Sequence, residues 1–320
     1  MLTRRDIRMK VMQALYAFMQ SDNKRLDTGE KKLIESIERI YLLYTWQLSF
    51  VLEVFDFARK RIEENSQKLL PSYEDLHPNM RFVNNRIAIA LANNKHYNDL
   101  SDKAKTNWSL HEEMVRKFYN TLKESDAYRQ YMEAPKATFE DDKNILLFMV
   151  REMLVGFELL QSHFEEMDIH WVDDYDTVLI LLERTLKSWK ASHDEYVKLP
   201  PLIKESIDDE QDDLYFARQL YKKVLLNTNQ YDQMIEEKIS NWEFDRVARV
   251  DIILLRMAVC EFLEFPYIPV KVTINEYIDI SKVFSSPKSK LFINGMLDKM
   301  ALHFREEGVL KKSGRGLIEN

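Results

Sequence analysis

The chain has 320 residues, with 46 Lys or Arg against 53 Asp or Glu and a formal net charge of −7. The single cysteine, Cys260, excludes an intramolecular disulfide, and no Cys/His metal pattern accompanies it. No stretch reaches the ~20 apolar residues of a membrane span, and the first residues lack the apolar core of a secretory signal. We therefore expect a cytoplasmic protein that does not enter a membrane.

Helices are predicted along the whole chain. Only 6 Gly and 8 Pro interrupt it, and apolar residues recur at the three- to four-residue spacing of amphipathic helices. The alternating pattern of half-buried strands does not occur. The predicted helices cover residues 3–21, 30–68, 79–95, 109–131, 139–167, 174–192, 210–226, 228–241, 245–264, 271–284 and 287–307. The predicted fold class is all-α.

Charged residues, prolines and glycines are unevenly distributed along the chain. Residues 140–213 hold 20 acidic and 7 basic residues, a net charge of −13, so the rest of the chain carries +6. Residues 200–209 begin with two prolines and are predicted to be a linker. Residues 308–320 contain three of the six glycines, and we expect them to form a flexible tail.

The sequence contains no pattern typical of an enzyme. The glycine-rich nucleotide loops, the serine-hydrolase elbow and the HExxH zinc motif are all missing. The seven histidines are scattered without metal-ligand spacing, and the paired acids stand at predicted helix starts, where the helix dipole favours negative charge. We therefore predict no catalytic residue, no metal site and no cofactor.

The first predicted helix is basic. Arg4, Arg5 and Arg8 recur within one helical turn, with Thr3 able to cap the helix. Guanidinium groups match phosphates with two parallel hydrogen bonds and stack on bases. Tyr16 lies two turns further along on a similar side. This pattern is compatible with a nucleic-acid contact and equally with an ordinary solvated helix face.

The last predicted helix combines basic and aromatic residues in a similar way. Ser286 can cap it and Pro287 can occupy its first position, beside Lys288 and Lys290. Exposed amides and lysines at a helix start favour a phosphate. Phe292 follows one turn later, and an aromatic ring there can stack an unpaired base, worth roughly 1–3 kcal/mol.

Two alternatives remain open for this helix. Phe292 can be a core residue, and Gly295 can serve to admit a neighbouring helix. If the helix contacts RNA, then Lys299 adds a third cation, and we expect the apolar side that carries Leu291, Gly295 and Met296 to pack inward.

Four motifs occur in a specific order along the chain. They are QALY at 13–16, LRMAVCE at 255–261, VTINEYIDISK at 272–282 and LFINGMLDK at 291–299. Together they resemble the bacterial transcription antitermination factor NusB family. The resemblance divides the chain into a first helix of a NusB-like domain at 1–21, a helical insertion at 22–199, the linker, and a C-terminal helical bundle at 210–307.

The resemblance implies NusB-like helical bundles with an additional helical region. It implies binding of boxA-type single-stranded RNA in ribosomal RNA operons, together with the NusE ribosomal protein and the RNA polymerase complex. One basic residue of the family's first helix is Asp6 here, which weakens one expected phosphate contact. The candidate RNA-binding residues are Arg4, Arg5, Arg8, Tyr16, Lys288, Lys290, Phe292 and Lys299, and the candidate partner-binding residues are Ile239, Asp245 and Asp251.

Two rival functions follow from the same residues. One is a helical protein-interaction scaffold that does not bind RNA, which the acidic segment 140–213 favours. The other is the NusB-like domain attached to some ribosomal RNA methyltransferases. No cofactor-binding glycine loop is present, so we predict no methyltransferase activity.

Overall fold

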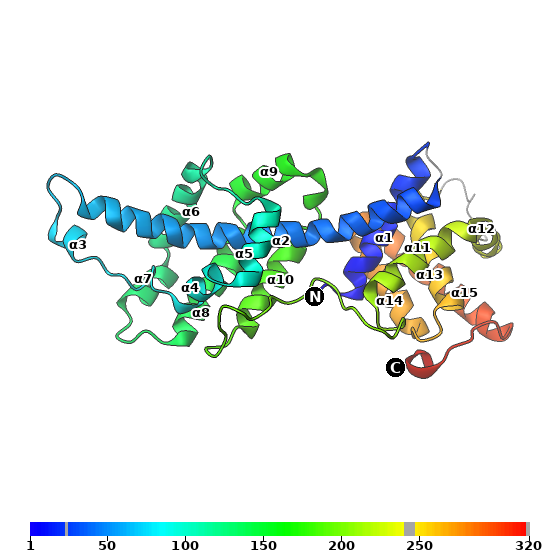
Figure 1. Ribbon diagram of the computed structural model, residues 1–320. Helices are drawn as coiled ribbons and strands as arrows, with labels where there is room; N and C mark the ends of the chain where they lie inside the picture. The colour runs from blue at the N-terminus through cyan, green and yellow to red at the C-terminus, as the bar shows by residue number, and fades with distance from the viewer. Residues whose placement is uncertain (23–24, 240–246, 318–320) are drawn as a thin grey trace. The chain divides into compact units, whose positions relative to one another are not determined.

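The computed structural model describes residues 1–22, 25–239 and 247–317, and within these ranges all regular secondary structure is helical (Figure 1). The predicted all-α fold class is confirmed. The elements are α1 (Arg4–Gln20), α2 (Leu26–Ser66), α3 (Tyr73–Leu76), α4 (Arg86–Ala92), α5 (Lys95–Ala104), α6 (Glu112–Glu124), α7 (Asp126–Glu133), α8 (Phe139–Phe148), η1 (Met149–Leu154), α9 (Glu158–Met167), η2 (Ile169–Trp171), α10 (Tyr175–Ser188), α11 (Asp213–Leu226), α12 (Thr228–Glu236), α13 (Arg249–Glu264), α14 (Val270–Phe284), α15 (Ser289–Glu306) and η4 (Gly314–Leu317).

Three predicted helices are shortened or divided in the structure. The predicted helices are 79–95, 109–131 and 139–167. The Asn85 side chain accepts the Ile87 and Ala88 amides and so starts α4. The Ser125 hydroxyl accepts the Tyr128 amide and separates α6 from α7. The third is broken by the π-helical η1 and the turn that follows it at Gly156.

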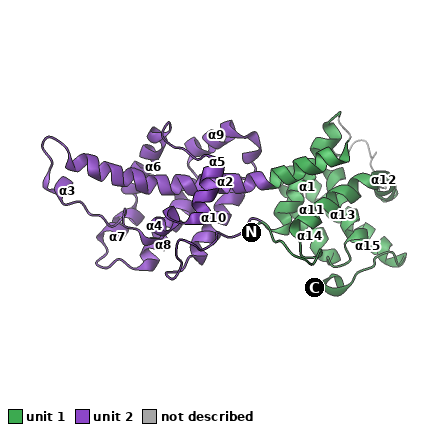
Figure 2. Cartoon of the chain, viewed as in Figure 1, with its two compact units in different colours: residues 1–37, 203–320 green, residues 38–202 purple. Residues whose placement is uncertain are grey.

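The chain forms two compact units (Figure 2). Unit 1 consists of residues 1–37 and 203–320, and unit 2 of residues 38–202. Unit 1 therefore contains α1 together with α11 to α15, whereas unit 2 contains most of α2 and the helices up to α10.

Helix α13 lies at the centre of unit 1. It packs against α1, α11, α12, α14 and α15 (Figure 1). Its sequence is apolar around most of its circumference, and the buried residues include Leu255, Val259, Cys260 and Phe262. A helix that is apolar on all sides is expected to be surrounded by other helices. The sequence LRMAVCE is therefore the core of this bundle.

A buried ion pair and its hydrogen bonds join α1 and α14 to α13. Glu261, fully buried, accepts two hydrogen bonds from Arg8 of α1, at 2.7 and 2.9 Å. The same carboxylate accepts the hydroxyls of Thr273 and Tyr277 of α14, at 3.1 and 2.6 Å. Burial alone would lower the pKa of Arg8, but Glu261 outweighs it and raises that pKa. This network holds α1 and α14 to the same carboxylate of α13.

The segment expected to be a flexible tail makes defined contacts as far as residue 317. Lys312 donates to the carbonyl oxygens of Glu261 and Phe265, each at 3.0 Å, at the C-terminal end of α13. The Ser313 amide donates to the Pro266 carbonyl at 3.0 Å. Burial lowers the pKa of Lys312 to about 8, against the opposing effect of Glu261. Cations at a helix C-terminus satisfy its free carbonyls.

Unit 2 has its own aromatic core around α2. Phe50 packs edge-on against Trp108 and Phe118, and Phe55 stacks on Phe82 at a centroid distance of 4.2 Å. Edge-on and stacked aromatic pairs add to the free energy gained by burial. This core is independent of the one around α13.

We expect Glu261→Gln to lower the free energy of unfolding of unit 1 by about 3 kcal/mol, because it leaves the buried Arg8 cation without its counter-charge. Native-state hydrogen exchange of α1 and α14 measures this. Asp27→Asn, which breaks an exposed pair with Arg25, is the matched control and should leave exchange unchanged. Equal exchange in the two variants would contradict a stabilising role for the buried pair.

Candidate nucleic-acid interface

Helix α1 begins with the cap that the sequence predicts. Thr3 accepts the Asp6 amide, and the Asp6 carboxylate accepts the Thr3 amide at 2.7 Å, which completes a capping box. Asp6 occupies the position at which the family pattern has a basic residue. It stabilises the start of the helix that carries the arginines.

The three arginines of α1 have different environments. Arg8 is buried in the ion pair with Glu261 and presents almost no surface to solvent. Arg4 pairs with Asp213 at 2.7 Å, and its guanidinium carbon lies 4.4 Å from the Phe216 ring centroid. The three guanidinium groups are thus not presented together, since Arg8 points into the core.

Arg5 is the most accessible of the three, with its side chain 41 % exposed. It binds Glu276 through two hydrogen bonds of 3.0 and 2.9 Å, and its Nη2 lies 2.7 Å from Asp279. The hydrogen bond to Glu276 raises the pKa of Arg5. Asp279 also pairs with Lys282 at 2.6 Å, and this hydrogen bond holds the pKa of Asp279 below its ordinary value. Arg5 therefore lies on the outer surface of α14, inside a balanced charge network.

The basic start of α15 is exposed. Lys288 and Lys290 are exposed, Phe292 is half-buried, and the helix begins at Ser289 rather than at Pro287. No side chain caps this start in the described structure: the Ser286 hydroxyl contacts the Ser289 hydroxyl, and only the Ser286 backbone carbonyl accepts the Ser289 amide, at 2.9 Å. As the sequence predicts, Lys288 and Lys290 lie at the first amides of α15, with the Phe292 ring one turn later.

The expectation for the apolar side of α15 is partly wrong. Met296 is buried as predicted, but Leu291 is 71 % exposed. Gly295 is exposed, and a Cβ placed there would meet nothing within 4 Å. Gly295 therefore does not admit a neighbouring helix. The helix backbone at Gly295 is therefore open to solvent. Because Phe292, Gly295 and Lys299 are three and four residues apart, they lie on the same side of α15.

Helix α14 connects Arg5 with the start of α15. It packs against both α1 and α15. Its outward residues recur at helical spacing, and we call them the outer stripe of α14: Val272, Glu276, Asp279 and Val283. Arg5 contacts the middle of this stripe, and α15 starts just beyond its end. From Asp279 to the end of α14 the distance is about 8 Å, at 1.5 Å per residue.

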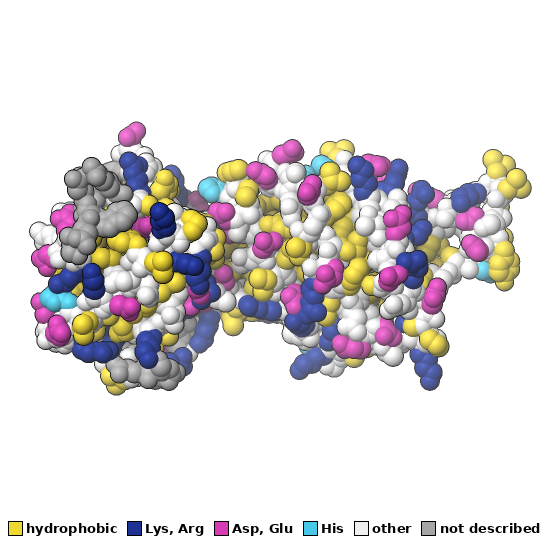
Figure 3. Space-filling view, turned by 180° about the vertical axis from the view of Figure 1, so that it is seen from behind, with side chains coloured by type: hydrophobic (Ala, Val, Ile, Leu, Met, Phe, Trp, Pro, Cys, Tyr) yellow, Lys and Arg dark blue, Asp and Glu magenta, His cyan; other side chains and the backbone are white. Residues whose placement is uncertain are grey.

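Tyr16 and Lys299 are two further accessible members of the candidate set, on α1 and α15. Tyr16 is 39 % exposed on α1, and Lys299 is exposed two turns after Phe292 on α15. On the face drawn in Figure 3, Lys and Arg are interspersed with Asp and Glu rather than gathered in one basic field. An attraction for phosphate is therefore local, within a screening length of about 8 Å.

The candidate partner-binding residues do not form one exposed edge. Asp245 lies outside the described residues, and Ile239 is half-buried just after α12. Asp251 is only 4 % exposed and accepts the Ser285 hydroxyl at 2.6 Å. The Ser285 hydroxyl oxygen also lies 2.9 Å from the Ser289 hydroxyl, from which it can accept. Asp251 thus positions the connection from α14 to α15.

Three residues that the sequence analysis did not assign belong to this surface. Glu276, Asp279 and Lys282 balance the charge of Arg5 and of one another. Their helical spacing indicates a common side of α14. No sequence pattern indicates that Arg5, far away in the chain, meets them there.

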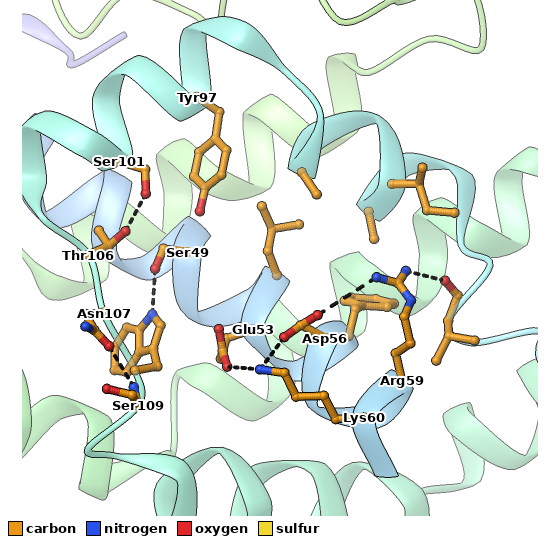
Figure 4. Close-up of a pocket in the computed structure, with 17 residues that line it drawn as sticks. Ser49, Glu53, Asp56, Arg59, Lys60, Tyr97, Ser101, Thr106, Asn107 and Ser109 are labelled. Atoms are coloured by element: carbon orange, nitrogen blue, oxygen red, sulfur yellow. Dashed lines mark hydrogen bonds and ion pairs between the residues drawn. The ribbon is translucent and has the colours of Figure 1, made fainter. Parts of the chain in front are cut away.

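Unit 2 contains a cavity of about 470 Å³ beside α2 (Figure 4). The Lys60 ammonium nitrogen lies 2.6 Å from a carboxylate oxygen of Asp56 and 3.9 Å from one of Glu53. The Arg59 guanidinium donates to the Val83 carbonyl at 3.3 Å. Burial raises the pKa of Glu53, and Lys60 opposes this effect. These charges compensate one another within the cavity, and their arrangement assigns it no ligand.

Among residues 1–22, 25–239 and 247–317, no group of three or more His, Cys, Asp or Glu is placed to hold a metal ion. In the same ranges, no helix combines the length and apolar character needed to cross a membrane.

The C-terminal part of the chain matches one protein family. The model of the NusB family matches residues 180–302. The transcription antitermination protein NusB of Salinibacter ruber is 39 % identical over 120 residues, which cover 38 % of this chain and 75 % of the relative. The NusB of Listeria innocua is 40 % identical over 105 residues, covering 33 % and 80 %. The NusB of Geotalea uraniireducens is 45 % identical over 96 residues, covering 30 % and 66 %.

The matched segment contains α11 to α15, with the acidic partners of Arg5 and the basic start of α15. Most of unit 2 lies outside it. The chain therefore belongs to the NusB family and carries an additional helical region.

Proposed function

We propose that unit 1 binds boxA-type single-stranded RNA and acts in transcription antitermination on ribosomal RNA operons. The NusE ribosomal protein and the RNA polymerase complex are its proposed partners, and the cytoplasm its site of action. The relatives that the chain matches are named transcription antitermination proteins. The proposal assigns neither a catalytic step nor a cofactor to the chain.

One observation carries the proposal. The outer stripe of α14 joins Arg5 to the start of α15, where two exposed lysines flank a half-buried aromatic ring. Single-stranded RNA is bound by stacking its bases on aromatic rings while cations follow its phosphates. Phe292 would supply the stacking surface, and Lys288, Lys290 and Arg5 the cations.

The accessible members of the candidate set form the proposed interface, which consists of Arg5, Tyr16, Lys288, Lys290, Phe292 and Lys299. Arg4 would contribute at its edge. Arg8 would act through Glu261, by holding α1 against α14. Gly295 would let a nucleotide approach the α15 backbone more closely than any other residue permits.

The proposed NusE contact involves Ile239, just after α12, and Asp245, which lies outside the described residues. Asp251 would contribute by positioning Ser285 rather than by touching the partner. The proposed domain organisation places residues 22–199 as an insertion and 200–209 as the linker that returns the chain to this bundle.

A protein-interaction scaffold without RNA binding is the second candidate function. It is favoured by the pairing of all three α1 arginines with carboxylates. A cation that is already paired attracts phosphate less strongly. The salt dependence of RNA binding separates the two functions, since each phosphate contact contributes a slope of about −0.7 in a log–log plot for single strands.

Removing the proposed stacking ring should weaken RNA binding. We expect Phe292→Leu to lower the affinity for boxA-type RNA about 10-fold, because it keeps apolar bulk but loses the aromatic face. Arg5→Ala should weaken binding further and make the salt slope about 0.7 shallower. Electrophoretic shift measures both, and Tyr73→Ala, an exposed ring of unit 2, is the control. A lower melting temperature with unchanged affinity would mean that both residues are structural.

Gly295→Ala separates RNA contact from packing. The new methyl group meets no protein atom, and Ala is favoured over Gly in a helix by about 1 kcal/mol. We therefore expect a more stable protein with a lower RNA affinity, measured by thermal unfolding and by titration of the RNA. Unchanged RNA affinity in a stabilised variant would remove Gly295 from the interface.

Asp279→Asn tests whether Arg5 contacts RNA. The variant frees Arg5 from one of its two carboxylates and removes a negative charge from the outer stripe of α14. We expect RNA affinity to rise severalfold at low salt. Glu53→Gln removes an acidic charge from unit 2 and is the control. A fall in affinity after Asp279→Asn would indicate that the pair positions Arg5 instead of masking it.

A further inference from the structure

Unit 1 contains a cavity of about 790 Å³ at the other end of the outer stripe of α14. Its walls are the first turns of α1 and α14, the segment before α11, and Arg315 of the C-terminal segment. Six lining residues are basic and three are acidic: Arg4, Arg5, Arg8, Lys204, Lys271 and Arg315 against Glu210, Asp213 and Glu276. The cavity is therefore cationic although the chain as a whole is acidic.

Three of these six cations are not engaged by a carboxylate: Lys204, Lys271 and Arg315. The three α1 arginines pair with Asp213, Glu276 and Glu261, and Lys204 donates to Gln211. Within the described ranges, neither Lys271 nor Arg315 has an ion-pair partner, and both are exposed at the cavity. They are the charges that remain available for an anion.

The C-terminal segment holds Arg315 in place. Lys312 is bound to the two carbonyls at the end of α13, and the Ser313 amide is bound to Pro266. Gly316 packs so closely on the Pro266 carbonyl that a Cβ there would overlap it. Arg315 thus lies between two anchored positions. Its place at the cavity follows from these contacts.

Neutral donors complete the cavity. Tyr267 is half-buried, and its hydroxyl makes no hydrogen bond of good geometry in the described part of the chain; burial raises its pKa to about 12, and the nearby Arg4 opposes this rise. No side chain caps the start of α14, which also lines the cavity at Lys271 and Val272. A buried polar group without a partner is costly, and an oxygen-rich anion would satisfy it.

We propose that this cavity binds a phosphate group, held by Lys271 and Arg315, and that its occupant is a backbone phosphate of the bound RNA. The identity of the occupant rests on the proposed RNA binding, whereas the preference for phosphate rests on the cavity itself. Helix α14 is about 22 Å long at 1.5 Å per residue. A strand that stacks on Phe292 and follows the outer stripe of α14 reaches the cavity at the opposite end.

The test compares Lys271→Ala/Arg315→Ala with the wild-type protein. We expect boxA-type RNA to bind at least 10-fold more weakly at low salt, with a salt slope shallower by about 1.4, corresponding to two lost phosphate contacts. Lys117→Ala/Lys136→Ala, which removes two exposed lysines of unit 2, is the matched control and should retain wild-type binding. Circular dichroism establishes that both variants are folded.

A titration with inorganic phosphate and with a nucleoside 5′-monophosphate separates the two sources of phosphate. Shifts of the Lys271 and Val272 amide resonances, lost in the double variant, support the cavity as a phosphate site. If the wild-type protein shows these shifts but binds no RNA, RNA binding is overturned and the site takes a free phosphate. If the double variant binds RNA with wild-type affinity and slope, the proposal is overturned.

Discussion

The buried pair between Arg8 and Glu261 determines how helices α1 and α14 of unit 1 are arranged. Glu261 belongs to the central helix α13 and accepts hydrogen bonds from α1 and from α14. A buried carboxylate with four donors is costly to disturb, because each donor left unpaired would lose a hydrogen bond in a low-dielectric interior. The pair therefore keeps α1 beside α14. Only in that arrangement does Arg5 reach the outer stripe of α14.

The surface that results is balanced rather than strongly basic. Arg5 and Lys282 are matched by Glu276 and Asp279, while Lys288 and Lys290 remain exposed at the start of α15. To bind RNA, Arg5 and Lys282 would then exchange their carboxylate partners for phosphates. Such an exchange depends on salt, and it favours a ligand that also stacks on Phe292 over one that offers charge alone.

Unit 2 has a core of its own and stands, in chain order, between the two segments that form unit 1. The aromatic cluster around α2 and the ion pairs that line its cavity stabilise unit 2 by contacts within the unit. The chain leaves the bundle through α2 and returns just before α11. A long insertion with its own core is tolerated because the entropic cost of closing a loop rises only slowly with loop length.

The sequence by itself determined that the chain is helical, that Thr3 starts the first helix and that the α15 start is basic and aromatic. These follow from local spacing, which depends on residues one or two turns apart. It did not determine that Arg8 is buried while Arg5 is exposed, that Asp251 holds Ser285, or that Leu291 and Gly295 face solvent. Those outcomes depend on which helix packs against which. Tertiary packing alone decides this, because residues far apart in the chain meet only in the folded bundle.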